Sequence, residues 1–335
     1  MRDSGADSSL RAGVDEALER EDSEKLAALV SDLPSTSVET RKECLRSLKA
    51  AVTDDSSLVK PALPACKALL EDDDRPVRLM TAKLFVAAAE TDPNAVVPTV
   101  PALAERLTDD EEFYYVRARS AEALGYVALE HPDIVTTPEL LADLRIGLSF
   151  DEPEVKEKLS KALEHVALGD PKRLAHHVST LAEHLADEDE LVRYHLCTAL
   201  VIVGCESPEK LTEVSDTLNA RLDDENAYVR GRAVEALGVL ARSDADAVLP
   251  DELPQPNDNE EPFIAERVRF ALVDDGLGGD EQGETDEQIG TVPAIRATTD
   301  EIVAEIMAPD GECPHCGLAL PENGPPMCPR CGAPY

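Results

Sequence analysis

The sequence predicts an all-α protein: an α-α superhelix, or solenoid, of stacked two-helix repeats, followed by an acidic linker and a small cysteine-rich module. Three observations lead to this prediction. One motif recurs along the chain at a nearly constant interval, the composition is 43% hydrophobic but only 3% aromatic, and four cysteines cluster near residue 320. Small aliphatic side chains suit closely packed helices. We therefore expect the solenoid over residues 1–250, the linker over 251–310 and the module over 311–335.

The recurring motif is an acidic turn followed by Val-Arg and a helix of small residues. Its clear copies are anchored by Val77, Val116, Val155, Val192 and Val229, which follow one another at nearly equal intervals. One further step outward, equal to the interval between Val77 and Val116, reaches a degraded copy on each side. These two copies are anchored at Val38 and Val268.

Within each copy the apolar residues follow a helical period. The seventh and eighth residues after the anchoring valine are apolar in all five copies, which gives the helix one buried stripe. A second amphipathic segment precedes each acidic turn, so each repeat is predicted to be two helices. Asp or Ser residues are expected to cap the second helices. The connections between repeats contain Pro93, Pro132, Pro171 and Pro208.

A two-helix repeat of this length with an Asp-rich turn and a Val-Arg-x-x-Ala-x-x-Ala-Leu motif resembles HEAT repeats, an armadillo-like helical class, and specifically the short repeats of phycobilisome lyases. The resemblance covers about residues 22–250. It implies a right-handed solenoid whose second helices line a concave face, and a scaffold function in binding another protein. The turn aspartates are expected to pair with the arginines that follow the valines in a ladder between repeats, interrupted at Lys156.

The predicted partner-binding surface consists of exposed positions on the second helices, because neighbouring repeats would place these positions on one continuous strip. The candidates are Arg119, Glu122, Lys158, Lys161, Tyr194, Arg232 and Glu235.

Two apolar islands interrupt the acidic linker. Residues 263–272 are expected to form a helix that caps the solenoid. Residues 298–307 are expected to form a short docking helix, since Thr298 and Glu301 have the spacing of a capping box.

The cysteine-rich module carries the most specific chemical signal. The sequences CPHCG and CPRCG place Cys313, Cys316, Cys328 and Cys331 at the spacing of two zinc knuckles, and the segment resembles a zinc ribbon of the rubredoxin-like kind. Four thiolates complete a tetrahedral site with no position open for water, so one structural Zn²⁺ is predicted rather than a catalytic ion.

Charge limits the choice of partners. The chain has 69 acidic and 32 basic residues, a net charge of −37. Such a surface repels phosphate backbones, so the solenoid is not expected to bind nucleic acid. Acids spread along the whole chain also indicate a halophilic protein, with an ordinary acidic protein as the alternative.

The sequence favours a non-catalytic scaffold in the cytoplasm, without a membrane segment. Two alternatives remain open. One is a nucleic-acid-associated regulator in which the ribbon touches DNA or RNA. The other is a lyase or hydroxylase of the HEAT-repeat class, although the His-Glu pairs of the di-iron hydroxylase relative are missing and Glu130-His131, Glu164-His165 and Glu183-His184 fall at different phases of the repeat.

Overall fold

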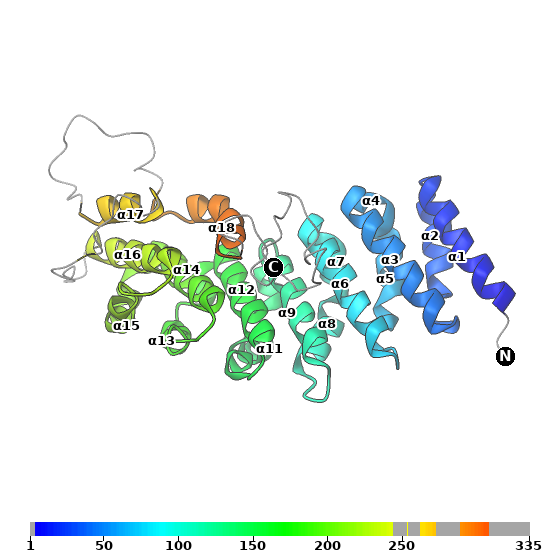
Figure 1. Ribbon diagram of the computed structural model, residues 1–335, viewed down its shortest axis with the longest axis horizontal. Helices are drawn as coiled ribbons and strands as arrows, with labels where there is room; N and C mark the ends of the chain where they lie inside the picture. The colour runs from blue at the N-terminus through cyan, green and yellow to red at the C-terminus, as the bar shows by residue number, and fades with distance from the viewer. Residues whose placement is uncertain (1–3, 244–252, 254–261, 273–288, 308–335) are drawn as a thin grey trace. The chain divides into compact units, whose positions relative to one another are not determined.

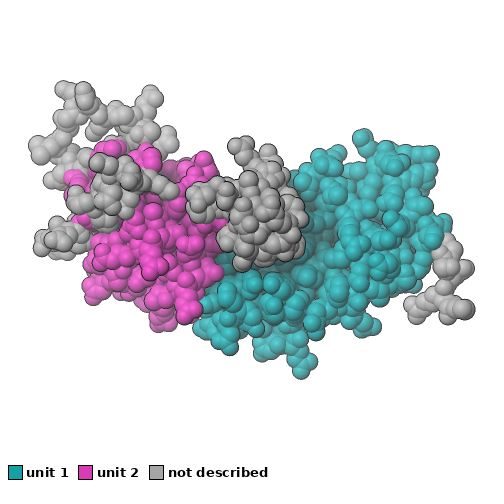
Figure 2. All heavy atoms as spheres, viewed as in Figure 1, with its two compact units in different colours: residues 1–173 teal, residues 174–335 magenta. Residues whose placement is uncertain are grey.

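The computed structural model describes residues 4–243, 253, 262–272 and 289–307, and every regular element in these ranges is a helix (Figure 1). The chain divides into two compact units, Met1–Arg173 and Leu174–Tyr335 (Figure 2). The prediction of an all-α helical repeat solenoid is confirmed. The cysteine-rich module at 311–335 lies outside the described residues.

In unit 1 the long second helices pack side by side in chain order. They are α3 (Val38–Asp54), α6 (Arg75–Thr91), α9 (Tyr114–Ala128) and α12 (Pro153–Gly169), preceded by α1 (Ser4–Glu19) and α2 (Ser23–Ser31). The first helix of each repeat is broken into α4 (Ser56–Val59), α5 (Leu63–Cys66), α7 (Pro93–Val96), α8 (Val100–Thr108), α10 (Pro132–Val135) and α11 (Pro138–Ile146). Short 3₁₀ segments join these pieces.

Unit 2 repeats the arrangement with fewer elements. Its second helices are α14 (Glu190–Glu206) and α16 (Ala227–Ala241), with α13 (Val178–Ala182) and α15 (Ser215–Ala220) before them. Helix α17 (Pro262–Leu272) packs against α16, as expected of the cap predicted at 263–272. Helix α18 (Val292–Met307) packs on α14.

The breaks in the first helices follow from their prolines. Pro64, Pro101 and Pro138 all lie in the first turn of a helical piece. Proline has no N–H to donate to the preceding turn, so a continuous helix cannot run through it. The sequence analysis expected one amphipathic helix here, and the structure instead shows short α and 3₁₀ pieces.

The second helices have the predicted core at every clear repeat, but the predicted Asp or Ser caps at only some of them. Asp74 accepts a hydrogen bond from Val77 N, and Asp189 accepts one from Val192 N. Helices α9 and α12 start without a side-chain cap. All ten residues at the seventh and eighth positions are buried: Leu84, Phe85, Ala123, Leu124, Ala162, Leu163, Ala199, Leu200, Ala236 and Leu237.

An ion-pair ladder joins neighbouring repeats, although its carboxylates are not all the predicted ones. The Arg78 guanidinium reaches back to the Asp72 carbonyl and forward to Glu112, with Nε 2.7 Å from Oε2. Arg193 makes the same bridge to Asp224 at 2.8 Å. At Arg117 the forward partner is the ring of Phe150, 4.2 Å away.

These ion pairs also show that the predicted position of the first degraded copy was wrong. Arg41 pairs with Asp72 at 2.8 Å, as Arg78 pairs with Glu112 in the next repeat. Thr40, rather than Val38, therefore stands where Val77 stands, and Val38 is the first residue of α3 after the Ser37 cap. The sequence analysis counted back from Val77 by the longer repeat interval, which separates Val77 from Val116. The first repeat instead has the shorter interval, which separates Val155 from Val192, so the count missed the correct position.

Candidate functional site on the second helices

The residues predicted for partner binding fall at the third and sixth positions after the anchoring residue, with Tyr194 at the second. We call the surface that these positions form within each unit the second-helix face of that unit. In unit 1 it includes Arg119 and Glu122 on α9 and Lys158 and Lys161 on α12. In unit 2 it includes Tyr194, Arg232 and Glu235. The residues of the two units differ in their burial and in their contacts.

In unit 1 a buried glutamate lies among basic side chains. The Arg119 guanidinium donates a hydrogen bond to Glu122, and the Lys158 ammonium lies 3.9 Å from the other carboxylate oxygen. Lys158 also pairs with Glu157 at 2.6 Å. Burial alone would raise the pKa of Glu122, but Lys158, Arg119 and Lys161 together lower it to about 2. Glu122 is therefore a permanent buried anion, not the exposed contact that the sequence analysis expected.

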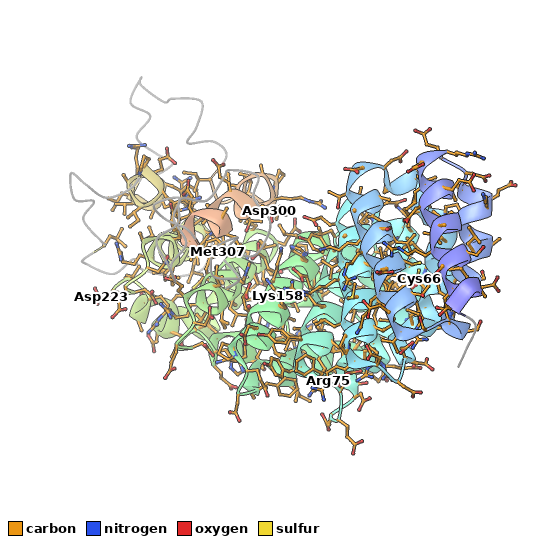
Figure 3. The ribbon with its side chains drawn as sticks, turned by 45° about the vertical axis from the view of Figure 1, so that its right-hand side comes forward. Cys66, Arg75, Lys158, Asp223, Asp300 and Met307 are labelled. Atoms are coloured by element: carbon orange, nitrogen blue, oxygen red, sulfur yellow. The ribbon has the colours of Figure 1, made fainter. Side chains whose placement is uncertain are left out.

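Lys161 and Tyr126 extend this cluster along the face. The Lys161 ammonium donates to the Tyr126 hydroxyl at 3.0 Å and lies 4.9 Å from the centre of its ring. Arg119 and Lys158 keep 27% and 16% of their side-chain surface exposed. Arg119 and Lys158 are therefore only partly accessible, and they are less exposed than the sequence analysis expected. Lys158 is labelled on its helix in Figure 3.

The sequence analysis missed Lys83 on α6. Burial lowers the pKa of this lysine, and the neighbouring Arg119 and Lys49 lower it further. Lys83 is the sixth residue after Val77, the position that Glu122 and Lys161 occupy in their repeats. Applying the same count to every repeat would have found it.

In unit 2 the predicted residues are buried. Tyr194 and Arg232 have no exposed surface and Glu235 has 1%. The expectation that they are exposed is therefore wrong, because residues 289–307 and helix α17 both lie against these second helices. The Gly290 N–H donates to Glu235 Oε1 at 3.0 Å, and the stretch around it leads directly into α18.

A network of ion pairs and hydrogen bonds lies beneath residues 289–307. Arg232 and Arg267 both pair with Glu235 Oε2, at 2.7 and 2.9 Å, and Arg232 donates to the Tyr194 hydroxyl at 3.1 Å. Burial opposes the charge on Glu235, but the two guanidiniums and the Gly290 N–H keep its pKa below the ordinary value. Each of these buried charges thus has an oppositely charged partner, although the two guanidiniums share the one carboxylate of Glu235.

Helix α18 binds this face through one stripe of side chains. Ile295, Thr299, Ile302 and Ile306 are buried and recur at helical spacing. The Tyr228 hydroxyl donates a hydrogen bond to Glu305 on the same helix. Asp300 and Glu301 remain exposed; Asp300 and Met307 mark the helix in Figure 3.

The predicted capping box at Thr298 is wrong. The helix begins six residues earlier, at Val292, and the Thr298 hydroxyl donates to the Ala294 carbonyl inside it. Pro293, near the helix start, was the better signal of where this helix begins.

A groove of about 460 Å³ separates parts of α17 and α18. Its walls include Phe263 and Arg267 on α17 and Thr298 and Glu305 on α18. Helix α18 therefore lies on the face without filling all the space beside it.

The predicted zinc ligands Cys313, Cys316, Cys328 and Cys331 lie outside the described residues, so the zinc site stays a prediction from spacing. Within the part of the chain that the structure describes, no three His, Cys, Asp or Glu side chains are grouped to hold a metal. The other cysteines are free thiols. Burial raises the pKa of Cys66 and of Cys197 to about 12, as expected of inert core residues.

The described helices are not long and apolar enough for any of them to cross a bilayer. They define a helical repeat solenoid with a charged second-helix face. Residues 141–238 match the family of HEAT repeats. No curated protein matches the sequence.

Several solved structures have the same fold. An engineered protein is 18% identical over 92% of this chain and 85% of its own, with a TM-score of 0.56. A designed armadillo repeat protein is 20% identical over 64% of this chain and 99% of its own, with a TM-score of 0.54. A mutant of Kap121p is 17% identical over 67% of this chain and 25% of its own, with a TM-score of 0.53. At these identities the likeness establishes the fold alone.

Proposed function

We propose that this protein is a non-catalytic scaffold that binds another protein on its second-helix face. The observation that carries the proposal is in unit 2, where the same face already holds a polypeptide segment, residues 289–307. That segment comes from far along the chain: Gly290 and its acceptor Glu235 are 55 residues apart. A surface that binds one segment in this way is suited to bind others.

A related fold supports the proposal by analogy. A designed armadillo repeat protein in complex with the peptide (KR)4 is 20% identical over 69% of this chain and 99% of its own, with a TM-score of 0.50. Stacked second helices in such folds offer one long surface to an extended or helical ligand.

The proposed scaffold also carries one structural zinc ion, held by the four cysteines near the C-terminus. Two Cys-x-x-Cys knuckles that follow each other closely, beginning at Cys313 and Cys328, support this. A tethered second module would give the scaffold a second contact with the same partner, and two weak contacts joined by a linker bind more tightly than either alone.

Site-specific photo-crosslinking tests the scaffold function. A photoreactive amino acid replaces Met80 or Lys161, both half-buried on the second-helix face of unit 1, in the full-length chain. Controls carry it at Lys67 or Lys172, which are exposed on the first-helix side. In extract of the source cells at native salt, we expect a discrete protein adduct from the face positions, identified by mass spectrometry. Equal adducts from the control positions, or none from the face, would contradict the proposal.

A further inference from the structure

We infer that helix α18 is an internal competitor of the partner: it occupies the second-helix face of unit 2, and an amphipathic helix of the partner displaces it. The inference rests on the proposed scaffold function and adds how binding to unit 2 is regulated. The partner helix that it requires carries aliphatic residues at the spacing of the buried stripe of α18.

Helix α18 contacts unit 2 in the way that a ligand helix contacts a groove. Only four of its 16 residues are buried, and these form the stripe of Ile295, Thr299, Ile302 and Ile306. Helix α14, on which it packs, is instead buried without interruption from Val192 to Gly204. Binding through one stripe is typical of helix-in-groove recognition. We therefore expect α18 to leave unit 2 without breaking the packing between α14 and α16.

The ion pairs beneath residues 289–307 are made by other parts of the unit. Glu235 and Arg232 are on α16 and Arg267 is on α17, so both ion pairs remain when the segment leaves. The donor that Glu235 loses is the Gly290 N–H, which water can replace. Covering charged groups also costs solvation free energy, which reduces the net gain from packing the stripe. Displacement of the segment therefore leaves Glu235 with both of its cationic partners.

Two threonines show that another helix could fit this site better than α18 does. Thr299 is only 4% exposed, in a stripe whose other members are isoleucines. Burial of a hydroxyl stabilises a contact less than burial of a methyl group in its place, because removing the hydroxyl from water costs free energy. Thr298 lines the groove of about 460 Å³ between α17 and α18, together with Phe263 and Ile302. A larger apolar side chain at the position of Thr298 would fill part of this groove.

These features define the chemistry of the partner helix. It carries an aliphatic residue where α18 has Thr299, and a larger apolar residue where α18 has Thr298. Because α18 belongs to the same chain, its effective concentration at the face is high, and a partner displaces it only through better contacts. Helix α18 thus sets the affinity that a partner must exceed to bind unit 2.

The test uses the full-length protein and a fluorescein-labelled peptide in place of the partner helix. The peptide has the sequence of residues 292–307 with Thr298→Leu and Thr299→Val. A matched peptide carries Ile302→Asp in addition. We expect the first peptide to bind about tenfold more tightly in fluorescence anisotropy, because a carboxylate in the stripe is costly to bury.

Alkylation of Cys205, resolved by peptide mass spectrometry, shows whether the bound peptide displaces the segment. The Cys205 thiol donates a hydrogen bond to the Gly290 carbonyl at 3.1 Å, so it lies against residues 289–307 while these are in place. We expect the reaction to become several-fold faster as the first peptide saturates the protein. The matched peptide at the same concentration should leave the rate unchanged.

Two protein variants change the internal contact in opposite directions. Ile302→Asp places a charge in the stripe of α18 and should tighten binding of the first peptide about tenfold, because the face is then free. Thr299→Val should weaken that binding about fivefold, because α18 then packs more tightly. Asp300→Asn changes an exposed residue of the same helix and should bind like the wild type. Circular dichroism confirms that the variants fold.

Equal binding of the two peptides, wild-type binding by both Ile302→Asp and Thr299→Val, or a constant rate of Cys205 alkylation would overturn the inference. These outcomes are separate from failure of the scaffold function. If a partner crosslinks to the second-helix face of unit 1 while the peptide leaves Cys205 alkylation unchanged, the scaffold function stands and only the role of α18 is wrong.

Discussion

At the scale of single residues, the buried carboxylate of Glu122 makes the stability of the folded protein depend on pH. Its pKa of about 2 in the folded protein lies below the ordinary value of 4.5, so the folded state favours the charged form. The carboxylate stabilises the fold fully when the pH is above the pKa of Glu122 in the unfolded chain. This stabilisation is lost as the pH falls through the pKa of Glu122 in the folded protein. We expect Glu122→Gln to lower the free energy of unfolding by about 2–3 kcal/mol at pH 7.

Urea unfolding of wild type and Glu122→Gln at a series of pH values measures this difference. It should shrink as the pH drops from about 5 toward 2, because the wild-type carboxylate then becomes protonated. Glu139→Gln is a matched control, since Glu139 is exposed in the first turn of α11. A difference between wild type and Glu122→Gln that stays constant over this pH range would show that packing, not charge, accounts for the loss.

At the scale of elements, Gly290 fixes how the segment before α18 lies on unit 2. Its φ of +75° is in the left-handed region, and a Cβ there would come within 2.5 Å of the Phe270 ring. Its carbonyl accepts a hydrogen bond from the Cys205 thiol at 3.1 Å. We therefore expect Gly290→Ala to displace residues 289–291 and to expose both Cys205 and Glu235.

Alkylation of Cys205, followed by peptide mass spectrometry, measures this displacement. In the wild type the reaction should be slow, because burial raises the pKa of the Cys205 thiol to about 12. Gly290→Ala should speed it several-fold, whereas Gly13→Ala in α1 should not, since a Cβ there meets only the flexible Leu29 side chain. An unchanged rate in Gly290→Ala would mean that the segment tolerates a side chain without moving.

The second helices could be predicted from the sequence because their pattern is local. The valine anchors and the stripe at the seventh and eighth positions repeat within each helix, and helical periodicity alone places Ala123 and Ala199 in the core. The broken first helices are equally local, and prolines such as Pro64 mark them. Greater weight on these prolines would have predicted the breaks.

The burial of the unit 2 residues beneath residues 289–307 could not be predicted in the same way. Periodicity indicates that Arg232 and Glu235 do not belong to the repeat's apolar stripe, but it does not say what lies above them. The contacts that bury them come from Arg267 and Gly290, up to 55 residues further along the chain. The sequence analysis therefore placed the candidate residues on the second helices, but only the structure shows which of them are buried and which remain partly accessible.

For the whole molecule, the net charge of −37 predicts a dependence on salt. Mutual repulsion among carboxylates favours expansion of the chain, and molar salt shortens the Debye length to about 3 Å, which screens it. We expect helicity to be lost on dilution from molar to millimolar KCl. Far-UV circular dichroism over the series measures it, and the same series in sucrose controls for a general osmolyte effect. A constant spectrum across the KCl series would rule out the halophilic interpretation.

The last prediction separates the solenoid from the cysteine-rich module by their need for metal. Residues 311–335 contain few large apolar side chains, so we expect zinc binding to supply their folding free energy. The solenoid has an extensive aliphatic core of its own and should not need metal. Chelation should therefore leave the helical circular dichroism signal nearly intact while zinc is lost. Metal analysis should give one zinc per wild-type chain, none in Cys328→Ser and one in Cys197→Ser, because the Cys197 thiol is buried with a pKa of about 12 and stays protonated. Zinc loss from Cys197→Ser, or its retention by Cys328→Ser, would show that the ligands are assigned wrongly.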